Sequence, residues 1–434
     1  MATTFRPYTP GQSILLPPSP RDWLPEGHLA YFISDTVDSL DLSSFYKPYE
    51  GDGRRNMPFE PRMMVKVLLY GYATGTFSSR KLEKKLYEDV AFRFLSGENF
   101  PAHRTIADFR KQHLAAFQEL FVQVVRLAKE LGLVKLGTVA IDGTKVKASA
   151  SKHKAMSYGR MQQEEKRLRA EIEELTTRAS QVDAEEDAVH GAEKSGDEIP
   201  SELQRREQRL KKIGEAMDRL KSRQAEEDRA AGRSPEAKSR SKRPFGEPPE
   251  KKQDNFTDPE SRIVKTSSGY EQGYNGQIAV DAESRLIVAA EVTQSAADVE
   301  QLLPMVEKTC AITQGVPSEI LADAGYRSEN NLQGLEEKKI DGYISLGRER
   351  KSPSVVNNPE KPATSRMQAK LATEKGRKTY SLRKGLVEPV NGWIKSVLGF
   401  RQFSLRGLAK VAGEWTLVCL ALNLKQLNPQ MEWK

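Results

Sequence analysis

A block of one hundred residues, 151–250, constrains the possible fold of this chain more than any other feature. The block carries 22 basic and 22 acidic residues, and its only aromatic residues are Tyr158 and Phe245. Charged side chains are seldom buried and aromatic side chains dominate hydrophobic cores, so this block cannot supply a core of its own. Within 157–252, two charged segments with helical patterns predict an antiparallel helical hairpin or a partly disordered segment, followed by a proline-rich linker from Gly232. Leucines at seven-residue spacing favour a coiled coil there. The packed core must come from the sequence on either side of the block.

The flanking sequence alternates between strand-like and helical segments. Short runs rich in β-branched residues end at turn signals, and the runs between them carry apolar residues at helical spacing. Without the charged block, the order is a strand, the two strands of a hairpin, and then helices that alternate with further strands. This order predicts an α/β fold, a mixed sheet flanked by helices. The expected strands are Thr138–Ile141, the hairpin strands Gln277–Asp281 and Leu286–Val292, then Glu319–Ala322 and Tyr343–Leu346.

Composition divides the chain into segments. Residues 58–134 are predicted to form a small all-α domain, because Pro58 and Pro61 stand where a helix begins and apolar residues then recur at helical spacing. The expected division is a loop-rich segment 1–57, the helical domain 58–134, the first core strand 135–156, the charged helical insertion and linker 157–252, the remaining α/β domain 253–427 and a tail 428–434.

The overall composition argues against several classes of protein. The sequence has no run of about 18 apolar residues, and Met1–Pro20 lacks the apolar segment that a secretory signal needs. Two cysteines, Cys310 and Cys419, cannot form a disulfide framework, which favours a cytoplasmic setting. The formal net charge is +8, and residues 361–410 alone carry twelve basic residues against two acidic ones. A solvated face explains any single charge run, but a local excess of this size favours a nucleic-acid partner.

Two aspartates follow short apolar strands. Asp142 comes after Val139–Ile141, and Asp323 comes after Ile320–Ala322. Carboxylates at the ends of neighbouring strands converge at one edge of a sheet, where open α/β sheets bind ligands. Such a pair repels unless a cation lies between its members, and Mg²⁺ prefers hard oxygen ligands of this kind. Each aspartate alone is equally well explained as the cap of a turn, whereas the pair, followed by an acid in a basic helix, favours a metal site.

The third acid is Glu388. Pro389 fits the first turn of a helix, which places Glu388 near a helix start, and Lys395 lies two turns later on the same face. A carboxylate for a metal and a lysine for a phosphate then share one face, whereas the simpler interpretation is a solvated amphipathic helix. Asp298 is the other candidate acid, but its position before a helical apolar pattern is better explained as a helix cap.

These segments resemble the DDE transposases of bacterial insertion sequences, which have a ribonuclease H-like catalytic core. One large group of that family carries the signature Tyr-x2-Arg-x3-Glu-x6-Lys. Here Tyr380-x2-Arg383 and Glu388-x6-Lys395 fit, but four residues separate Arg383 from Glu388. Lys384 has the inner spacing instead, so either basic residue can take the role of the arginine. The resemblance runs from about Leu40 to Leu427, and the matching segments are Ala140–Thr144, Gly273–Gln277, Leu321–Tyr326 and Val387–Lys395.

The resemblance implies roles for the site residues. Asp142, Asp323 and Glu388 are then the catalytic acids, and they hold two Mg²⁺ ions, or Mn²⁺, that activate water and then a DNA 3′-hydroxyl. The implied partner is double-stranded DNA, both the terminal repeats of the element and the target, bound by a homodimer associated with the bacterial nucleoid. The residues expected to contact DNA are Lys145, Lys147, Arg383, Lys384 and Lys395 near the acids, and Arg80, Arg104 and Arg110 on the helical domain.

Three alternatives stay open on the sequence alone. A ribonuclease H-like nuclease that cuts without joining strands shares the same metal chemistry. A non-catalytic DNA-binding scaffold built around the insertion needs none of the three acids, and an inactive copy is compatible with intact motifs. The role of Trp393 is equally open, since this residue either stacks on a displaced base or packs in the core.

Overall fold

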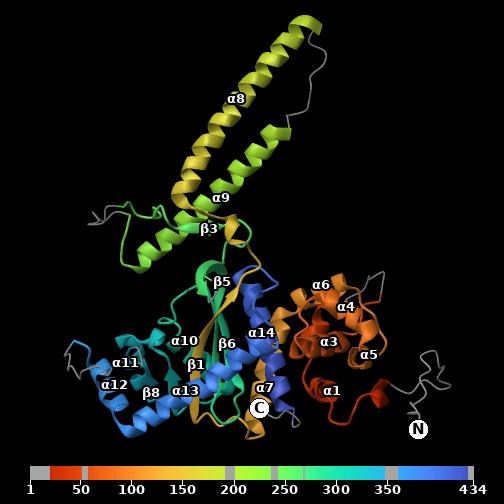
Figure 1. Cartoon of the computed structure of the whole chain (residues 1–434), viewed down its shortest axis with the longest axis vertical. Coiled ribbons are helices and arrows are strands. Elements are labelled where there is room, and N and C mark those ends of the chain that lie inside the picture. Colours follow the sequence, from red (N-terminus) through yellow and green to blue (C-terminus); the bar gives the residue numbers. More distant parts are fainter. Residues whose placement is uncertain are drawn as a thin grey trace, which may run out of the picture.

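The computed structural model describes residues 20–50, 57–190, 201–235, 243–266, 269–347 and 360–428, without the side chains of 179–202 (Figure 1). A sheet with helices around it forms the body of the molecule, and a long helical hairpin projects away from that body (Figure 1). The strands of the main sheet are β1 (Thr138–Lys147), β4 (Arg262–Thr266), β5 (Gly269–Asp281), β6 (Ile287–Thr293), β7 (Glu319–Ala322) and β8 (Asp341–Ile344). The helices that follow the hairpin strands are α10 (Leu302–Thr313), α11 (Glu329–Glu337), α12 (Pro362–Ala372), α13 (Glu374–Gly392) and α14 (Leu408–Leu427).

The predicted mixed sheet is confirmed. Its strand order is β4-β5-β1-β7-β8, and β6 also pairs with β5. Strands β5 and β6 form the expected antiparallel hairpin, β1 is antiparallel to β5, and β7 is parallel to both β1 and β8. This arrangement is compatible with the ribonuclease H-like core implied by the resemblance.

The first strand is longer than predicted. We expected it to end at Asp142, but β1 continues to Lys147 because β5 pairs with it along its whole length. The parallel pairing with β7, in contrast, stops at Ile141. Asp142 therefore lies inside a strand, at the point where that strand loses one of its two neighbours.

The region before the sheet contains more helix than expected. The prediction that 1–57 is loop-rich is wrong for α1 (Leu29–Ser39) and α2 (Ser43–Tyr46), whereas 1–19 and 51–56 lie outside the described residues. The buried residues Ala30, Ile33 and Val37 of α1 have helical spacing, a signal that was present in the sequence. Within 58–134 the structure has α3 (Pro61–Ala73), α4 (Ser79–Glu88), α5 (Val90–Ser96), α6 (His103–Gln112) and α7 (Leu114–Glu130).

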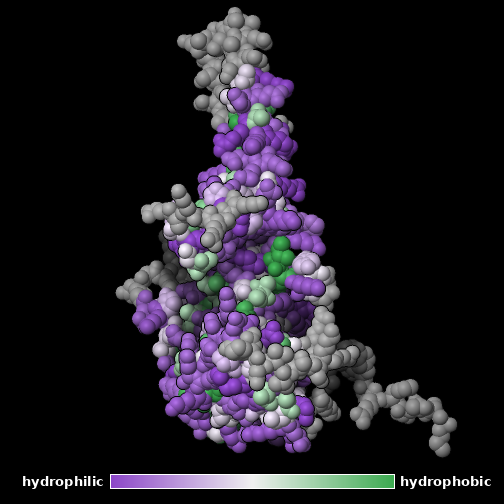
Figure 2. All heavy atoms as spheres, turned by 90° about the vertical axis from the view of Figure 1, so that its left-hand side faces the viewer, coloured by the Kyte–Doolittle hydropathy of each residue, from purple (hydrophilic) through white to green (hydrophobic). Residues whose placement is uncertain are grey.

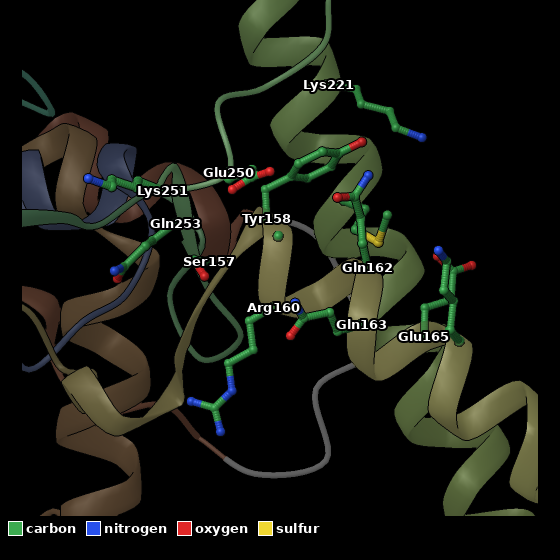
Figure 3. A pocket seen from close by; sticks show the side chains of 13 residues that line it. Ser157, Tyr158, Arg160, Gln162, Gln163, Glu165, Lys221, Glu250, Lys251 and Gln253 are labelled. Atoms are coloured by element: carbon green, nitrogen blue, oxygen red, sulfur yellow. The ribbon is translucent and has the colours of Figure 1, made fainter.

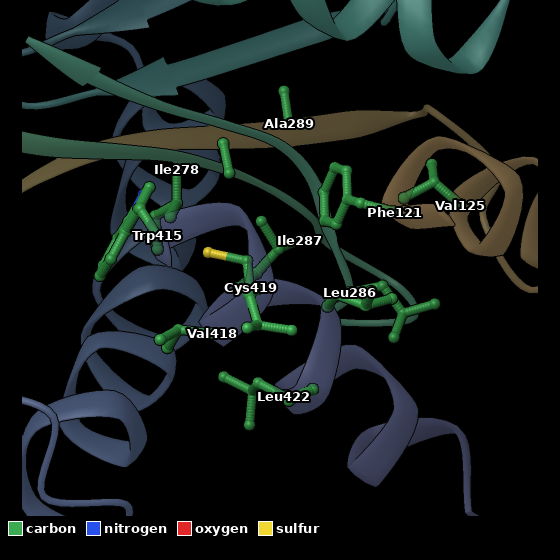
Figure 4. Packing of buried hydrophobic residues seen from close by; sticks show 14 of the residues in the cluster. Phe121, Val125, Ile278, Leu286, Ile287, Ala289, Trp415, Val418, Cys419 and Leu422 are labelled. Carbon is green, nitrogen blue, oxygen red and sulfur yellow. The ribbon is translucent and has the colours of Figure 1, made fainter. Parts of the chain in front are cut away.

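These helices and the sheet share one hydrophobic core. Helix α14 packs against α3, α7 and β6, so it joins the two parts. Because α14 is apolar on nearly all of its faces, it is stable only when surrounded. Its Cys419 and Leu422 belong to the same core as Phe121 of α7 and Ile287 of β6 (Figure 4). No helix in the described parts of the chain is long and apolar enough to span a membrane.

The charged block forms the predicted helical hairpin. It consists of β2 (Ala155–Ser157), α8 (Tyr158–His190), α9 (Ser201–Ala230) and β3 (Gln253–Asn255), with β2 and β3 paired at its base. Met161 and Leu168 of α8 pack with Ile213 and Leu220 of α9 in a small core separate from the main one. Residues 191–200 and 236–242, which belong to the expected connection and linker, lie outside the described residues.

Candidate active site

Asp142 and Asp323 lie at the same place on neighbouring strands. The parallel pairing of β1 with β7 ends at Ile141 and Ala322, so the two aspartates are the next residues along each chain direction. Asp323 caps the 3₁₀ turn Ala324–Tyr326, and its Oδ1 accepts a hydrogen bond of 2.8 Å from the backbone N–H of Gly325. The structure thus brings together two of the three acids expected from the sequence.

Asp142 is the more buried of the pair, and α13 covers it. Its side chain is 17% exposed, and its Oδ2 accepts a hydrogen bond of 2.9 Å from Nδ2 of Asn391. Nη1 of Arg383 lies 3.9 Å from its Oδ1. Burial raises the pKa of Asp142 to about 6, with Arg383 opposing this shift and the negative charge of Asp323 adding to it. Because burial and Asp323 both disfavour the ionised form of Asp142, any further positive charge at the sheet edge stabilises that ionised form.

The helical geometry of α13 distinguishes the two basic residues of the signature. Arg383 is buried on the face that meets the sheet, with its side chain 9% exposed, whereas Lys384 is exposed. Desolvation disfavours the charged guanidinium, but Tyr380 and Asp142 more than offset it and raise the pKa of Arg383. Arg383, and not Lys384, is therefore the cation beside Asp142.

Glu388 lies elsewhere on the same helix. The prediction that it stands near a helix start is wrong, because α13 runs from Glu374 to Gly392 with Pro389 inside it. A proline inside a helix cannot donate to the carbonyl four residues earlier, yet α13 continues three residues past Pro389. Glu388 is exposed and precedes Asn391 by three residues, one turn along the helix. Within the described residues, no three His, Cys, Asp or Glu side chains are close enough together to hold a metal ion, so Glu388 is not gathered with the two aspartates.

Asp298 joins the site from the opposite face of β1. The prediction that it caps a helix is wrong, because α10 begins at Leu302 with Gln301 as its cap residue. The Asp298 carboxylate instead accepts hydrogen bonds from Lys145 at 3.1 Å, Asn275 at 2.6 Å and Gln277 at 2.8 Å. Successive strand residues point to opposite faces, so Asp142 turns toward α13 while Lys145 turns toward Asp298.

Gly143 allows this close approach. A Cβ atom at Gly143 would lie 2.5 Å from both Asp298 Oδ1 and Gln277 Nε2. Any larger residue would therefore push these side chains away from the strand. The segment Gly273–Gln277 had been matched only as a motif, and its two amide side chains are functional candidates that the sequence reasoning did not single out.

Tyr326 connects the two faces. Its buried hydroxyl donates a hydrogen bond to Oε1 of Gln277. Burial raises the pKa of Tyr326, and the negative charges of Asp298, Asp142 and Asp323 raise it further, in that order. The phenol therefore stays neutral and acts as a donor, surrounded by three carboxylates.

Lys395 and Lys147, two of the lysines predicted to meet DNA, differ in their surroundings. Lys395 lies in the π-helical turn Trp393–Val397 that ends α13, and such turns are frequent at functional sites. Burial lowers its pKa, Asp142 opposes that shift, and Arg401 and Lys145 add to it, so Lys395 belongs to the group around the acids. Lys147 is farther along β1 and forms an ion pair of 3.3 Å with Glu271.

Two further predictions concern residues outside the acid group. Trp393 is half-buried and packs against the main core, with Nζ of Lys425 5.1 Å from the centroid of its ring. Arg110 is not on the surface, which corrects its assignment as a DNA contact. It is 5% exposed and donates hydrogen bonds to the hydroxyl of Tyr72 and the carbonyl of Phe77.

Arg80 on α4 and Arg104 on α6 are exposed, as a DNA contact requires. Arg110 was misassigned as a surface residue because α6 turns its side chain toward the core.

The residues at the sheet edge fit a divalent cation. Two like charges meet there, and next to Asp142 the buried Oδ1 atom of Asn391 has no hydrogen-bond partner. Oxygen atoms of carboxylates and amides are the ligands that Mg²⁺ and Mn²⁺ take in proteins. Asp142 and Asp323 are the residues placed to hold such an ion.

Comparison with known proteins identifies the family of this chain. A family model described as a transposase DDE domain matches residues 216–424, which include Asp323 and Glu388 but not Asp142. A second, described as a transposase domain (DUF772), matches residues 18–112. A search of curated proteins and a search of solved structures found no match. Both matched families are transposase domains. The DUF772 match lies in the N-terminal helical region, and the DDE match ends in the α/β region that follows it. The chain belongs to the DDE transposases of insertion sequences.

Proposed function

We propose that this transposase cuts and joins DNA strands by metal-dependent phosphoryl transfer at the edge formed by β1 and β7. The juxtaposition of Asp142 and Asp323 where the parallel pairing ends carries this proposal. Bound there, Mg²⁺ or Mn²⁺ supplies a Lewis acid and an activated oxygen nucleophile for in-line displacement at phosphorus. Glu388, one helical turn before Asn391, would complete the ligand set.

The surrounding residues orient the acids and the phosphates. Asn391 fixes one oxygen of Asp142 by its hydrogen bond, which leaves the other oxygen for a ligand. Lys395 and Lys145 lie close to the acids and offer positive charge to the phosphates that flank the scissile bond. Arg383 limits the repulsion between the two aspartates before any cation binds.

The partners follow from the same proposal. The substrate is double-stranded DNA, first the ends of the element and then a target. Because an element has two ends, a homodimer that holds both is the expected assembly. Exposed Arg80 and Arg104 on the N-terminal helices are candidates for contacts outside the catalytic edge.

A strand-joining assay tests the proposal. The purified full chain is incubated with Mg²⁺, a plasmid target, and duplexes that carry the inverted repeats flanking its coding region and end in a free 3′-hydroxyl. We expect joined product from the wild type and none from D142N or D323N at equal DNA binding. Cutting without joining would instead identify a nuclease. A wild type that binds the duplexes but neither cuts nor joins them would identify a non-catalytic scaffold, and unchanged joined product from both variants would show that these two acids are not catalytic.

A further inference from the structure

A cleft lies at the base of the helical insertion, away from the acids. It has a volume of about 520 Å³ and is formed by the segment that leads into β2, the first turn of α8, the first half of α9 and the segment after β3. No acidic residue lines it. We call it the basic cleft; its charged or titratable lining residues are His153, Lys154, Arg160, Arg205, Arg209 and Lys212.

The absence of acids is unusual for this part of the molecule. Elsewhere on the hairpin, basic residues pair with acids one turn away, as Arg169 does with Glu165 at 2.7 Å. The pocket on the neighbouring side of α8 mixes both signs, and there Arg160 points away from Glu250 (Figure 3). The face of the hairpin that Figure 2 shows is mostly hydrophilic, with a few scattered hydrophobic residues. A cleft of one sign therefore stands out against a balanced surface.

Most of the cations in the basic cleft lack a partner. In the part of the chain that the structure describes, Lys154, Arg205 and Lys212 form no ion pair, and all three are exposed. Arg160 is exposed as well, and its charge helps to lower the pKa of Glu164. Arg209 is the exception, since its Nη2 lies 2.8 Å from Glu164. Unpaired cations that face one cavity repel one another, so they favour a polyanion that spans several of them.

The cleft rests on a packed base. Ile213 is buried in the small core of the hairpin, and Met156 and Phe256 pack against that core. The backbone of Phe256 is tied to that of Lys154 by a hydrogen bond of 3.0 Å, next to the β2–β3 pair. The cations therefore project from a fixed platform rather than from a loose end of the hairpin.

The path of the chain links this cleft to the acids. Strand β1 carries Asp142 and continues through Lys147 toward His153, the first residue of the cleft, eleven positions later. Eleven residues extend to at most ~40 Å, close to one turn of B-DNA at ~34 Å. The cleft therefore lies no farther from Asp142 than about one turn of a duplex, so a duplex that starts at the acids and runs along β1 can reach it.

We propose that the basic cleft binds the phosphate backbone of the DNA duplex whose end lies at Asp142 and Asp323. This inference rests on the proposed function, because that function supplies the duplex. The contacts are to phosphates, so they position the DNA and do not read its sequence.

The test compares two variants with the same change in charge. R205Q/K212Q removes two unpaired cations of the cleft, and the control R169Q/R178Q removes two exposed arginines that are paired with acids on α8. Affinity for a random-sequence duplex of roughly three turns is measured by fluorescence anisotropy between about 50 and 200 mM salt. Circular dichroism and the thermal midpoint check that both variants fold as the wild type does.

We expect the cleft variant to bind more weakly and with less dependence on salt. Each phosphate contact contributes ~0.9 to the slope of log affinity against log salt, so two lost contacts lower the slope by about 1.8. At about 0.1 M salt, this salt-dependent contribution raises the DNA affinity roughly eightfold for each phosphate contact. The loss of two contacts therefore lowers the affinity by on the order of tenfold or more. The control should match the wild type. Equal behaviour of the two variants would overturn the inference.

A second measurement uses the wild-type protein. Bound duplex should slow acetylation of Lys154 and Lys212 severalfold relative to Lys221, which lines the mixed-charge pocket. Equal rates with and without DNA would contradict the inference. Failure of the proposed function is separate: a wild type that binds DNA through the cleft but never cuts or joins it leaves this site standing and removes the catalysis.

Discussion

Replacing Asp142 by asparagine should stabilise the metal-free protein. Burial raises the pKa of this carboxyl from its ordinary value near 3.8 to about 6, so the folded protein holds a proton that the unfolded chain has already released. Stability therefore falls as the pH rises between these two values and stays lower above them. The difference corresponds to ~3 kcal/mol, at 1.36 kcal/mol for each pH unit.

The D142N side chain removes this cost and keeps the local hydrogen bond. Its amide is never ionised, and its oxygen accepts from Asn391 as the carboxylate does. Above pH 6 we expect the variant to be more stable by up to ~3 kcal/mol, or about 3 °C in thermal midpoint for a chain of this length that unfolds as one unit. Below about pH 4 both side chains are neutral in the folded and unfolded states, so the two midpoints should converge.

Thermal unfolding with a chelator present, followed across this pH range, measures the effect. Adding Mg²⁺ at neutral pH should raise the midpoint of the wild type and leave that of D142N nearly unchanged, because ligand binding stabilises only a protein that retains the site. A variant less stable than the wild type at pH 7 would refute the reasoning. So would a difference that does not change with pH, because it would show that Arg383 fully compensates the buried charge.

Three further substitutions test other parts of the account. Gly143→Ala should lower strand joining by roughly 100-fold without loss of DNA affinity, since its Cβ displaces Asp298, and normal joining by this variant would contradict that packing. Arg383→Ala should abolish joining while Lys384→Ala keeps most of it, and the reverse order would show that the wrong residue was placed beside Asp142. Glu414→Gln should lower the free energy of unfolding by ~3 kcal/mol in a denaturant titration, because Glu414 is fully buried and accepts hydrogen bonds from two backbone N–H groups; an unchanged midpoint would argue against this.

Local sequence patterns were sufficient to predict the strands and to identify two of the three acids. A short apolar run that ends in an aspartate identifies both Asp142 and Asp323, and their meeting follows from the parallel pairing of adjacent strands. The charged insertion is equally local, because its composition alone excludes it from the core. Even there, the pattern placed the end of β1 too early, since the pairing with β5 is a contact between residues more than one hundred positions apart.

The misassigned residues depend on contacts between distant segments. Asp298 has the position of a helix cap, but Asn275, Gln277 and Lys145 offer it more hydrogen bonds than its own helix does. Arg110 has the composition of a surface residue, yet Tyr72 accepts a hydrogen bond from it inside the core. The spacing of residues within one helix or strand cannot predict which hydrogen-bond partner a polar side chain takes, because the competing partners lie on other elements.

The third acid shows the same limit. Pro389 predicts the start of a helix, because proline is best tolerated in the first turn, but α13 carries this proline in its last turn. The helix that results places Glu388 on an exposed surface and Arg383 and Asn391 toward Asp142.

Iron-directed cleavage of the backbone tests the central claim most directly. Fe²⁺ that replaces Mg²⁺ generates hydroxyl radicals with ascorbate and peroxide, and these cut the chain close to the bound ion. We predict cuts next to Asp142 and Asp323, and a third next to Glu388, all suppressed by excess Mg²⁺ and absent from the D142N/D323N double variant. Cuts confined to other parts of the chain, or cuts that persist unchanged in the double variant, would contradict a metal site at the edge of β1 and β7.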